Sequence, residues 1–494
     1  MIKKIKDFLF RNTTTRQTVA KNTFWLAVSN FGGRFIRAGV IIYAARVLGA
    51  ASWGVFSYAI TLVAFFTLFG DLGINNILTK EIAKAPSENH RLAILSSSFF
   101  IKVALAALGV LLILFIAPHL TKIQEVNTIL PIVVFVMIFD SLREFGFAII
   151  HGTERMEQST AIFLGTNVAI VVLGFIFLRI SPTVKSFAIA YALGTGMGAV
   201  ATVFPLKQYL KKFVSGFSFS TVKRILSASW PFAVSGALGM LLTNTDILIV
   251  GWFRTAEDIG LYSAAIRIIQ LLYLLPVTVQ VSALPTFARL AAGDSQKFRQ
   301  ALERAASFLF LIAIPVALCG AILGKEIMSF VFGEGFVAGA ASLQVLMLTM
   351  LFNFPAVLIS SAVFAYNRQK QLIIYSAIAG VANVILDLVL IPRFGITGSA
   401  FATLFAQILS NSYLWYVMKK INYFEIMPHL KKIIAASFAA AAASLALLTL
   451  GMHILLITVV VIGIYAAILA LLREPVLEEF RLVLNPSAGD REVQ

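Results

Sequence analysis

Apolar residues in this chain come in long runs separated by short polar stretches. Fourteen runs each approach the roughly 20 residues that a helix needs to cross the hydrocarbon core of a membrane. The pattern predicts an all-α polytopic membrane protein with fourteen transmembrane helices. The predicted spans are 23–47, 54–78, 92–117, 128–150, 160–180, 185–207, 226–251, 259–288, 304–324, 338–366, 371–391, 396–418, 430–450 and 453–472.

Composition supports a membrane protein. Of 494 residues, 59% are hydrophobic and only 13% are charged, more apolar surface than a soluble chain of this length could bury. Cys319 is the only cysteine, which excludes an intramolecular disulfide, and its apolar surroundings indicate a core residue. The formal net charge of +17 could suggest nucleic acid, but the basic residues lie in short loops between the runs. We therefore expect the bilayer, and no nucleic acid, as a partner.

The basic residues also predict orientation. With the N-terminus in the cytoplasm, 28 of the 40 Lys and Arg residues fall on the cytoplasmic side, seven outside and five within spans. Positive charge favours the cytoplasmic side, so we predict a multi-pass cell-membrane protein with both termini in the cytoplasm. The basic start could belong to a signal peptide, but the run 23–49 is too long and contains arginines. We interpret it as an uncleaved first span.

An internal repeat relates the two halves of the chain. With an offset of 206 residues, ten of 34 positions match between 27–60 and 233–266, including "WGVFSYA" against "IGLYSAA". Six spans per lobe is an even number, which predicts two lobes in the same orientation, as in parallel-repeat transporters with a central cavity. The predicted organisation is a basic N-terminus (1–22), a first lobe (23–210), a cytoplasmic linker (211–225), a second lobe (226–420), two C-terminal helices (421–473) and a cytoplasmic tail (474–494).

Several segments carry a family resemblance. They include "RVLGAASWGVFSYAITLVAFFTLFGDLGINNILTKEIAK", "ASWPFAVSGALGMLLTNTDILIVGWF" and "ANVILDLVLIPRFGITGSAFAT". The sequence resembles the polysaccharide transporter (O-antigen, Wzx-type flippase) family of the MOP superfamily. The resemblance implies two lobes around a cavity. It also implies movement of a lipid-linked oligosaccharide, usually on undecaprenyl diphosphate, from the inner to the outer leaflet by alternating access.

Two arginines occupy the first span. Arg34 lies about 16 Å into a helix that enters the bilayer near residue 23, and Asn30, Arg34 and Arg37 share one face. A charge at such a depth costs roughly 2.5–3.5 kcal/mol or more, so these residues need partners. One interpretation is an anion site for a diphosphate, since guanidinium groups bind phosphate through paired hydrogen bonds. The other is an ion pair with Asp71 or Asp246.

The repeat bears on this choice. Arg34 and Arg37 align with Met240 and Thr243, so the second lobe lacks the cationic stripe, although it carries Arg267 on its second span. We include Arg267 among the candidate substrate-binding residues. The difference between the lobes fits an asymmetric substrate with one anionic end and a polar glycan.

Other charged residues within spans have two readings each. Asp140, Arg143 and Glu144 are spaced so that they could pair within one helix, or Asp140 could serve the cavity. Asp71 with Asn75 could hold a coupling H⁺ or Na⁺, or could make a polar contact between helices.

Two further polar features lie within spans. Asn383 and Asp387 share a face and should close their span against its neighbours, and Lys102 is expected to reach a lipid headgroup.

Three other functions are alternatives to the flippase. A multidrug or organic-cation antiporter of the same superfamily would favour acidic and aromatic residues in its cavity, without paired arginines. A membrane glycosyltransferase or ligase is disfavoured because the outer loops are short and no GxSxG, Walker A or metal-spaced His/Cys set occurs. No enzyme activity, cofactor or metal is expected. A scaffold role without transport stays open.

Overall fold

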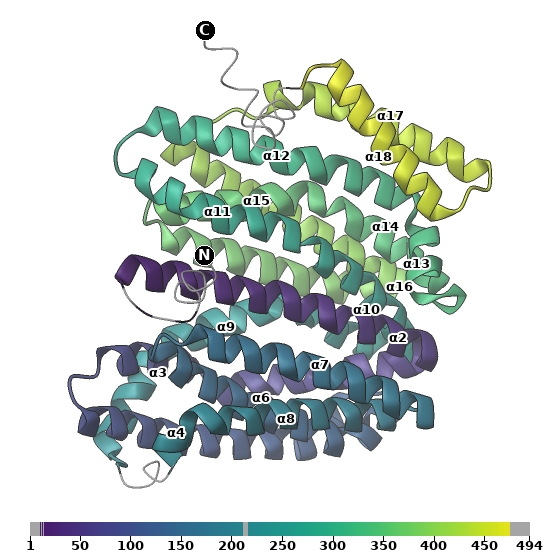
Figure 1. Cartoon of the computed structure of the whole chain (residues 1–494). Helices are drawn as coiled ribbons and strands as arrows, with labels where there is room; N and C mark the ends of the chain where they lie inside the picture. The colour runs from purple at the N-terminus through teal and green to yellow at the C-terminus, as the bar shows by residue number, and fades with distance from the viewer. Residues whose placement is uncertain (1–9, 11, 13, 211–215, 475–494) are drawn as a thin grey trace. The chain divides into compact units, whose positions relative to one another are not determined.

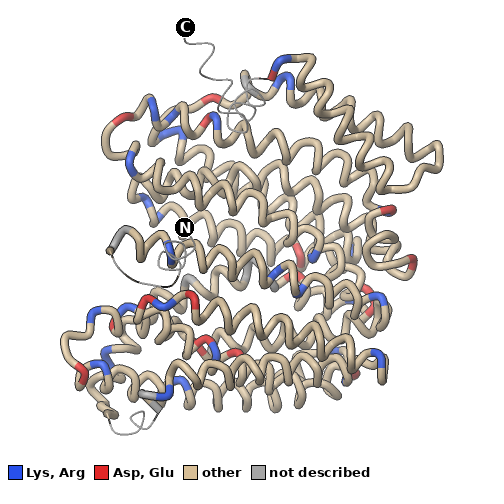
Figure 2. The backbone as a smooth tube through the Cα atoms, viewed as in Figure 1, with Lys and Arg blue, Asp and Glu red and all other residues tan. Residues whose placement is uncertain are grey.

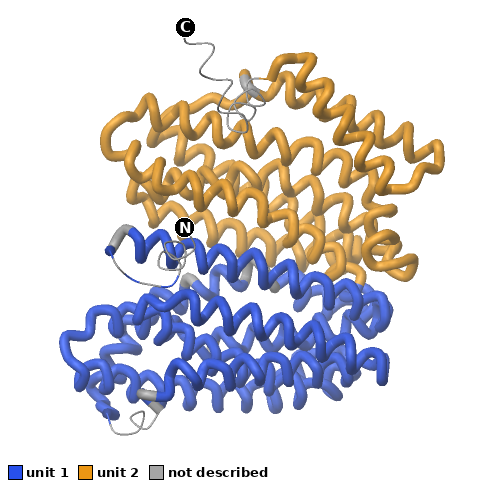
Figure 3. Tube along the Cα trace, in the orientation of Figure 1, with its two compact units in different colours: residues 1–260 blue, residues 261–494 orange. Residues whose placement is uncertain are grey.

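The computed structural model describes residues 10, 12, 14–210 and 216–474, and within them the regular structure is helical (Figure 1). The all-α prediction is confirmed. The chain divides into two compact units, residues 1–260 and residues 261–494 (Figure 3). The helices are α2 (Thr15–Asp71), α3 (Ile74–Lys84), α4 (Glu88–Leu111), η1 (Leu112–Ile116), α5 (Ala117–Leu120), α6 (Gln124–Gly152), α7 (Met156–Ile180), α8 (Val184–Leu210), α9 (Phe219–Phe253), α10 (Ala256–Leu272), α11 (Leu274–Ala291), α12 (Ser295–Ile322), α13 (Gly324–Phe332), η2 (Glu334–Gly339), α14 (Ala340–Leu348), α15 (Met350–Ala365), α16 (Gln369–Ile421), α17 (Met427–Thr449) and α18 (Ile454–Leu471).

The helices have the length and composition of membrane spans. Among the described residues, nine helices are long and apolar enough to cross a membrane, or up to eleven if each of two bent pairs forms one span. Large apolar side chains such as Phe115, Ile180 and Leu471 lie on the outside of these helices. Lys and Arg gather mostly near the helix ends (Figure 2). A water-soluble protein would bury such surface, so the chain is a polytopic membrane protein.

Glycines interrupt two of the longest helices. Gly49 has φ +76° inside α2, and Gly395 has φ +63° inside α16, conformations that residues with a Cβ rarely adopt. Each break falls between two predicted spans. The predicted second span, 54–78, is wrong at its end, because Leu72 and Gly73 take positive φ and separate α2 from α3.

Small residues bring the helices of unit 1 together. A Cβ on Gly174 would lie 2.7 Å from Val40, one on Gly194 2.6 Å from Ile170, and one on Gly146 2.9 Å from Thr202. Close approach at small residues is the usual basis of helix packing in membranes, where lipid is as apolar as a leucine side chain. These contacts set α2, α6, α7 and α8 side by side.

Unit 2 contains the helices from α11 to α18 and most of α10. Its last two helices pack through Ala440 on α17 with Ile457 and Val461 on α18. Cys319 packs against this cluster, which agrees with its assignment as an apolar core residue. The predicted N-terminus (1–22), linker (211–225) and tail (474–494) fall partly on residues 1–9, 11, 13, 211–215 and 475–494, outside the described part of the chain.

Candidate functional site

The arginines of α2 are held differently from one another. Arg37 Nε donates a 2.8 Å hydrogen bond to Asn167 Oδ1, and its guanidinium carbon lies 5.8 Å from the centre of the Tyr191 ring. Arg34 is exposed and makes no ion pair with any described residue. Asn30 is exposed too, and its amide donates to Leu26 O at 3.0 Å. The predicted stripe therefore has one anchored guanidinium and one accessible guanidinium.

The anchor of Arg37 is built by α7. Asn167 is fully buried, and its Nδ2 donates to Phe163 O at 2.7 Å, which leaves Oδ1 to accept from Arg37. Gly33 permits this approach, because a Cβ there would lie 2.9 Å from Phe163 Cδ1 and 3.2 Å from Asn167 Nδ2. Pattern reasoning on one span missed Asn167, since the contact joins residues 130 positions apart.

Three charged residues of α6 pair with one another. Arg143 is buried, and its guanidinium lies 2.7 Å from Asp140 Oδ1 and 3.2 Å from Glu144 Oε1. The guanidinium carbon also lies 5.7 Å from the ring centres of Phe147 and Phe163. The expected pairing within one helix is confirmed, and it involves Asp140 in an ion pair.

Asp71 pairs with a lysine. Lys102 Nζ on α4 lies 2.5 Å from Asp71 Oδ1 at the end of α2, and the lysine side chain is buried. The expectation that Lys102 reaches a lipid headgroup is therefore wrong, because a buried ammonium close to a carboxylate stays with it. Among the two readings for Asp71, the polar contact between helices is the one that this geometry shows. Neither Arg34 nor Arg37 is ion-paired with Asp71 among the described residues.

These groups form a charged network in the interior of unit 1. Glu144 interacts electrostatically with Lys102 as well as with Arg143. Tyr191, which contacts Arg37, also lies within the electrostatic reach of Arg143. The network joins α2, α4, α6 and α8, and within it the hydrogen-bond partner of Arg37, Asn167, is not an acid.

The remaining predicted site residues belong to α9 and α10. Asp246 on α9 is 7% exposed. Arg267 on α10 is partly buried and donates a 2.9 Å hydrogen bond to Gln270 Oε1. Asp246 lies in unit 1 and Arg267 in unit 2.

Unit 2 has an interior network of neutral groups. The Tyr273 hydroxyl lies 3.3 Å from Thr349 Oγ1 and accepts a 2.5 Å hydrogen bond from Asn353 Nδ2, while Asn411 Nδ2 donates to Asn353 Oδ1 at 3.1 Å. The sequence pattern did not single out these residues, because they come from α11, α15 and α16. The contrast with the charged network of unit 1 is a difference in chemistry between the two units.

Asn383 and Asp387 behave as expected. Ser399 Oγ donates to Asp387 Oδ1 at 2.9 Å, and Asn383 Nδ2 donates to Thr403 Oγ1 at 3.4 Å. Both bonds join the two halves of α16 across the break at Gly395. The prediction that these side chains close their span against its neighbour is confirmed.

An apolar groove runs along unit 2. Its volume is about 680 Å³, and its walls come from α12, α15, α16 and α17, with Ile314, Leu351 and Phe438 among the lining side chains. Lys419 lines both this groove and an adjoining pocket of about 430 Å³. An apolar channel with a cation at one end suits a hydrocarbon chain bearing an anionic group.

Comparison with known proteins identifies the family. The family model described as "Polysaccharide biosynthesis protein" matches residues 19–291, more than half of the chain. The chain belongs to this polysaccharide biosynthesis protein family. The resemblance inferred from the sequence segments is therefore confirmed. A second model, named MatE, matches residues 231–389, which is consistent with membership of the MOP superfamily.

Relatives and solved structures share the family's fold. The "Probable low-salt glycan biosynthesis flippase Agl15" of Haloferax volcanii is 24% identical over 78% of this chain and 80% of its own length. The lipid II flippase MurJ in an inward closed conformation matches with a TM-score of 0.72 and 19% identity, over 91% of this chain and 99% of that one. An inward-facing multidrug resistance MATE family transporter matches with a TM-score of 0.66 and 13% identity, over 79% and 94%. The chain thus has the MurJ and MATE fold.

Proposed function

We propose that this protein is a flippase that moves undecaprenyl-diphosphate-linked oligosaccharide across the cell membrane by alternating access. One observation carries the proposal: Arg37 is anchored by the neutral amide of Asn167, and Arg34 is accessible beside it. Arginines that serve the fold inside a membrane pair with acidic groups or backbone carbonyls, as Arg143 does with Asp140, whereas the partner of Arg37 is a neutral side chain. The positive charge on α2 is left for an external anion.

A diphosphate meets the requirement of these arginines. Each guanidinium can donate two charge-assisted hydrogen bonds to phosphate oxygens. Asn30 and Arg267 complete the proposed substrate-binding residues.

The finer architecture belongs to the same proposal: fourteen spans, in two six-helix lobes related by a parallel repeat, around a central cavity. The breaks at Gly49 and Gly395 support the count, because each divides one long helix into two lengths sufficient to cross the bilayer. Burial supports the repeat. Residues 53–59 and residues 259–265, which the offset of 206 relates, are buried throughout. Gly54 and Gly260 occupy equivalent positions in the two segments.

Transport is driven by an ion gradient, with H⁺ or Na⁺ as the candidate coupling ion, or by the membrane potential, and both termini lie in the cytoplasm. The candidate coupling residues are Asp71, Asp140 and Asp246. Protonation of Asp71 or Asp140 would break its pair with Lys102 or Arg143, and the conformational preference of the lobe would change with it.

The second candidate is a multidrug or organic-cation antiporter, favoured by the match to the MatE model. Organic cations are repelled by a site with two uncompensated arginines. The flippase named in Haloferax volcanii and the polysaccharide family model both support lipid-linked glycan as substrate.

Complementation of a flippase-deficient strain tests the proposal. Arg34→Ala and Arg37→Ala should each abolish complementation while protein levels in the membrane stay near normal. Arg34→Lys should restore only part of the activity, because an ammonium lacks the planar fork. Arg46→Ala is the matched control, since Arg46 lies on the same helix near its break and is exposed. Full transport by the Arg34→Ala, Arg37→Ala double variant would refute the anion site.

A further inference from the structure

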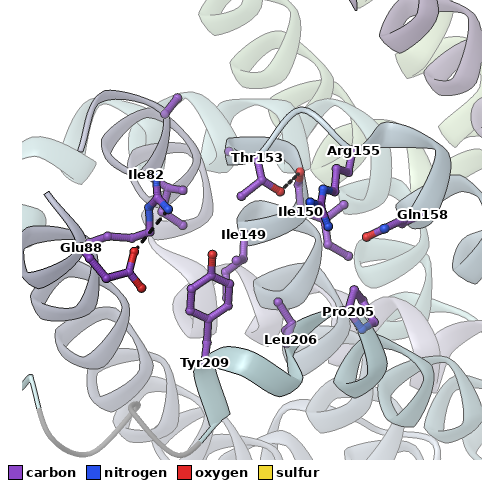
Figure 4. A pocket seen from close by; sticks show the side chains of 13 residues that line it. Ile82, Glu88, Ile149, Ile150, Thr153, Arg155, Gln158, Pro205, Leu206 and Tyr209 are labelled. Atoms are coloured by element: carbon purple, nitrogen blue, oxygen red, sulfur yellow. Dashed lines mark hydrogen bonds and ion pairs between the residues drawn. The ribbon is translucent and has the colours of Figure 1, made fainter. Parts of the chain in front are cut away.

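A polar pocket lies where several helices of unit 1 end. It has a volume of about 510 Å³ and receives residues from α3, α4, α6, α7 and α8, with Arg91, Arg155 and Tyr209 among them (Figure 4). The transport function proposed above uses none of these three residues. A cluster that serves only the fold would pair its hydrogen-bond donors. Here Arg91 and Arg155 have donors without acceptors among the described residues.

Hydrogen-bond donors of the pocket lack acceptors among the described residues. Arg91 Nε is buried and has no hydrogen-bond partner among the described residues, while its Nη1 lies 3.5 Å from Glu88. Arg155 is exposed, and its guanidinium makes no hydrogen bond or ion pair with a described residue. Tyr209 is 6% exposed, and Figure 4 shows its hydroxyl pointing into the space between Glu88 and Arg155. Arg91, Arg155 and Tyr209 thus all line one volume.

An apolar groove continues from this pocket. It has a volume of about 650 Å³ and shares Gln158 and Pro205 with the pocket. Small residues line it along α7 and α8, namely Ala161, Gly165, Ala169, Gly198 and Ala201. A Cβ on Gly165 would meet nothing within 4 Å, so the groove is open at that point.

The dimensions of pocket and groove match one kind of molecule. From Gln158 to Ala169 the groove follows α7 for eleven residues, about 16 Å at the rise of an α-helix. That is about half the thickness of the hydrocarbon core, the depth of a single leaflet. A phosphate group in the pocket would place an acyl chain in the groove. Pocket and groove together have the shape of a lipid headgroup site with its chain channel.

The net charge of the residues that line the pocket indicates the headgroup of the lipid. Arg91 and Arg155 against Glu88 leave a net charge of about +1, which balances one phosphodiester rather than a diphosphate. The proposed orientation places the helix ends from Lys84 to Glu88 and from Gly152 to Met156 at the cytoplasmic surface. Anionic phospholipids concentrate there, and basic pockets between helices bind their headgroups.

We propose that this pocket and groove form a binding site for an anionic phospholipid of the cytoplasmic leaflet, separate from the transport site. Arg91, Arg155 and Tyr209 donate to the phosphodiester, and the chain lies along Gly165 and Ala169. Occupancy ties the ends of α4, α6, α7 and α8 together. The lipid therefore stabilises the folded protein, by an amount that rises with the logarithm of the lipid concentration divided by its dissociation constant.

Lipid binding to the purified full-length protein tests the site. The thermal unfolding midpoint in neutral detergent is measured with added dioleoylphosphatidylglycerol, dioleoylphosphatidylcholine or inorganic phosphate. We expect stabilisation by phosphatidylglycerol and little by the other two. Arg155→Gln and Gly165→Leu should each weaken phosphatidylglycerol binding by about tenfold or more, the loss expected for a charge-assisted hydrogen bond or a blocked channel.

Matched variants separate the site from general effects. Arg179→Gln changes an exposed arginine in the last turn of the same helix, and Gly463→Leu fills open space on α18; both should leave binding unchanged. Equal stabilisation by inorganic phosphate, with no effect of Gly165→Leu, would overturn the lipid assignment in favour of a phosphate site. Displacement of phosphatidylglycerol by undecaprenyl diphosphate at lower concentration would overturn it in favour of the transported lipid. Unchanged binding by Arg155→Gln would overturn the site itself. Transport loss in the Arg34 and Arg37 variants is measured separately, so failure of one proposal is distinguishable from failure of the other.

Discussion

Gly54 and Gly260 face each other through their backbones in a reciprocal contact. A Cβ on Gly54 would overlap the carbonyl oxygen of Ala256 and lie 2.8 Å from Gly260 N. A Cβ on Gly260 would overlap the carbonyl oxygen of Ala50 and lie 3.1 Å from Gly54 N. The offset of 206 relates Ala50 to Ala256 and Gly54 to Gly260. A contact that maps onto itself when its two sides are exchanged is what the proposed repeat predicts.

The first prediction concerns this contact. Gly54→Ala and Gly260→Ala should each destabilise the protein by about 1–3 kcal/mol or more, because the added methyl group must push two backbones apart. Thermal unfolding of the purified protein measures the effect. Gly463→Ala is the control, since nothing lies within 4 Å of a Cβ there. Unfolding midpoints equal to that of the parent protein for both variants would contradict the close approach.

The second prediction concerns the pair of Lys102 and Asp71. Lys102→Met leaves the carboxylate without its partner, and Asp71→Leu leaves a buried ammonium. Each should cost about 3–5 kcal/mol, the penalty for breaking a buried ion pair from one side. The exposed fraction of Asp71, 29%, makes the lower end of that range more appropriate for Lys102→Met. The amount of folded protein extracted from the membrane reports the loss.

The double variant Lys102→Met, Asp71→Leu should recover most of the stability, because neither charge is then left alone. Lys297→Met serves as the comparison. Its partner is Asp294, both side chains are well exposed, and exposed pairs contribute about 0–1 kcal/mol. A double variant no more stable than the worse single variant would show that the two side chains do not act as a pair.

The third prediction assigns Asn167 the role of positioning Arg37. Asn167→Leu removes the acceptor for Arg37 Nε without changing the charge of the helix. Both the transport rate and the affinity for substrate should fall, because the guanidinium of Arg37 loses its fixed direction. Asn167→Gln should rescue part of the activity by restoring an amide oxygen. A variant with normal transport and reduced stability alone would give Asn167 a purely structural role.

The fourth prediction is the topology. Reporter fusions after Lys212 and Lys420 should read as cytoplasmic, and a fusion after Asp258 should read as external. The reason is the distribution of Lys and Arg, 28 of which fall in cytoplasmic segments in this orientation. The reverse pattern at all three positions would invert the orientation, and a mixed pattern would contradict the number of spans between them.

Sequence alone determined the class of this protein and most of its helices. Hydrophobic runs identify spans because the bilayer leaves a chain few ways to satisfy its backbone groups. The gaps between predicted spans contain the breaks at Gly49 and Gly395, but local composition does not say whether a loop or a single residue makes each turn. Spacing within one helix also predicted the ion pairing of Asp140, Arg143 and Glu144, since their contacts depend only on helix geometry.

Contacts between helices were decided by the tertiary structure. The partner of Arg37 is Asn167 and the partner of Lys102 is Asp71, and neither pair follows from spacing along one helix. The pocket of Arg91, Arg155 and Tyr209 likewise assembles from helices distant in sequence. Such contacts depend on which faces of the helices pack together, and in lipid that choice rests on small residues and shape rather than on hydrophobicity. A pattern of apolar residues shows that a helix crosses the membrane, but not which neighbour its polar side chains meet.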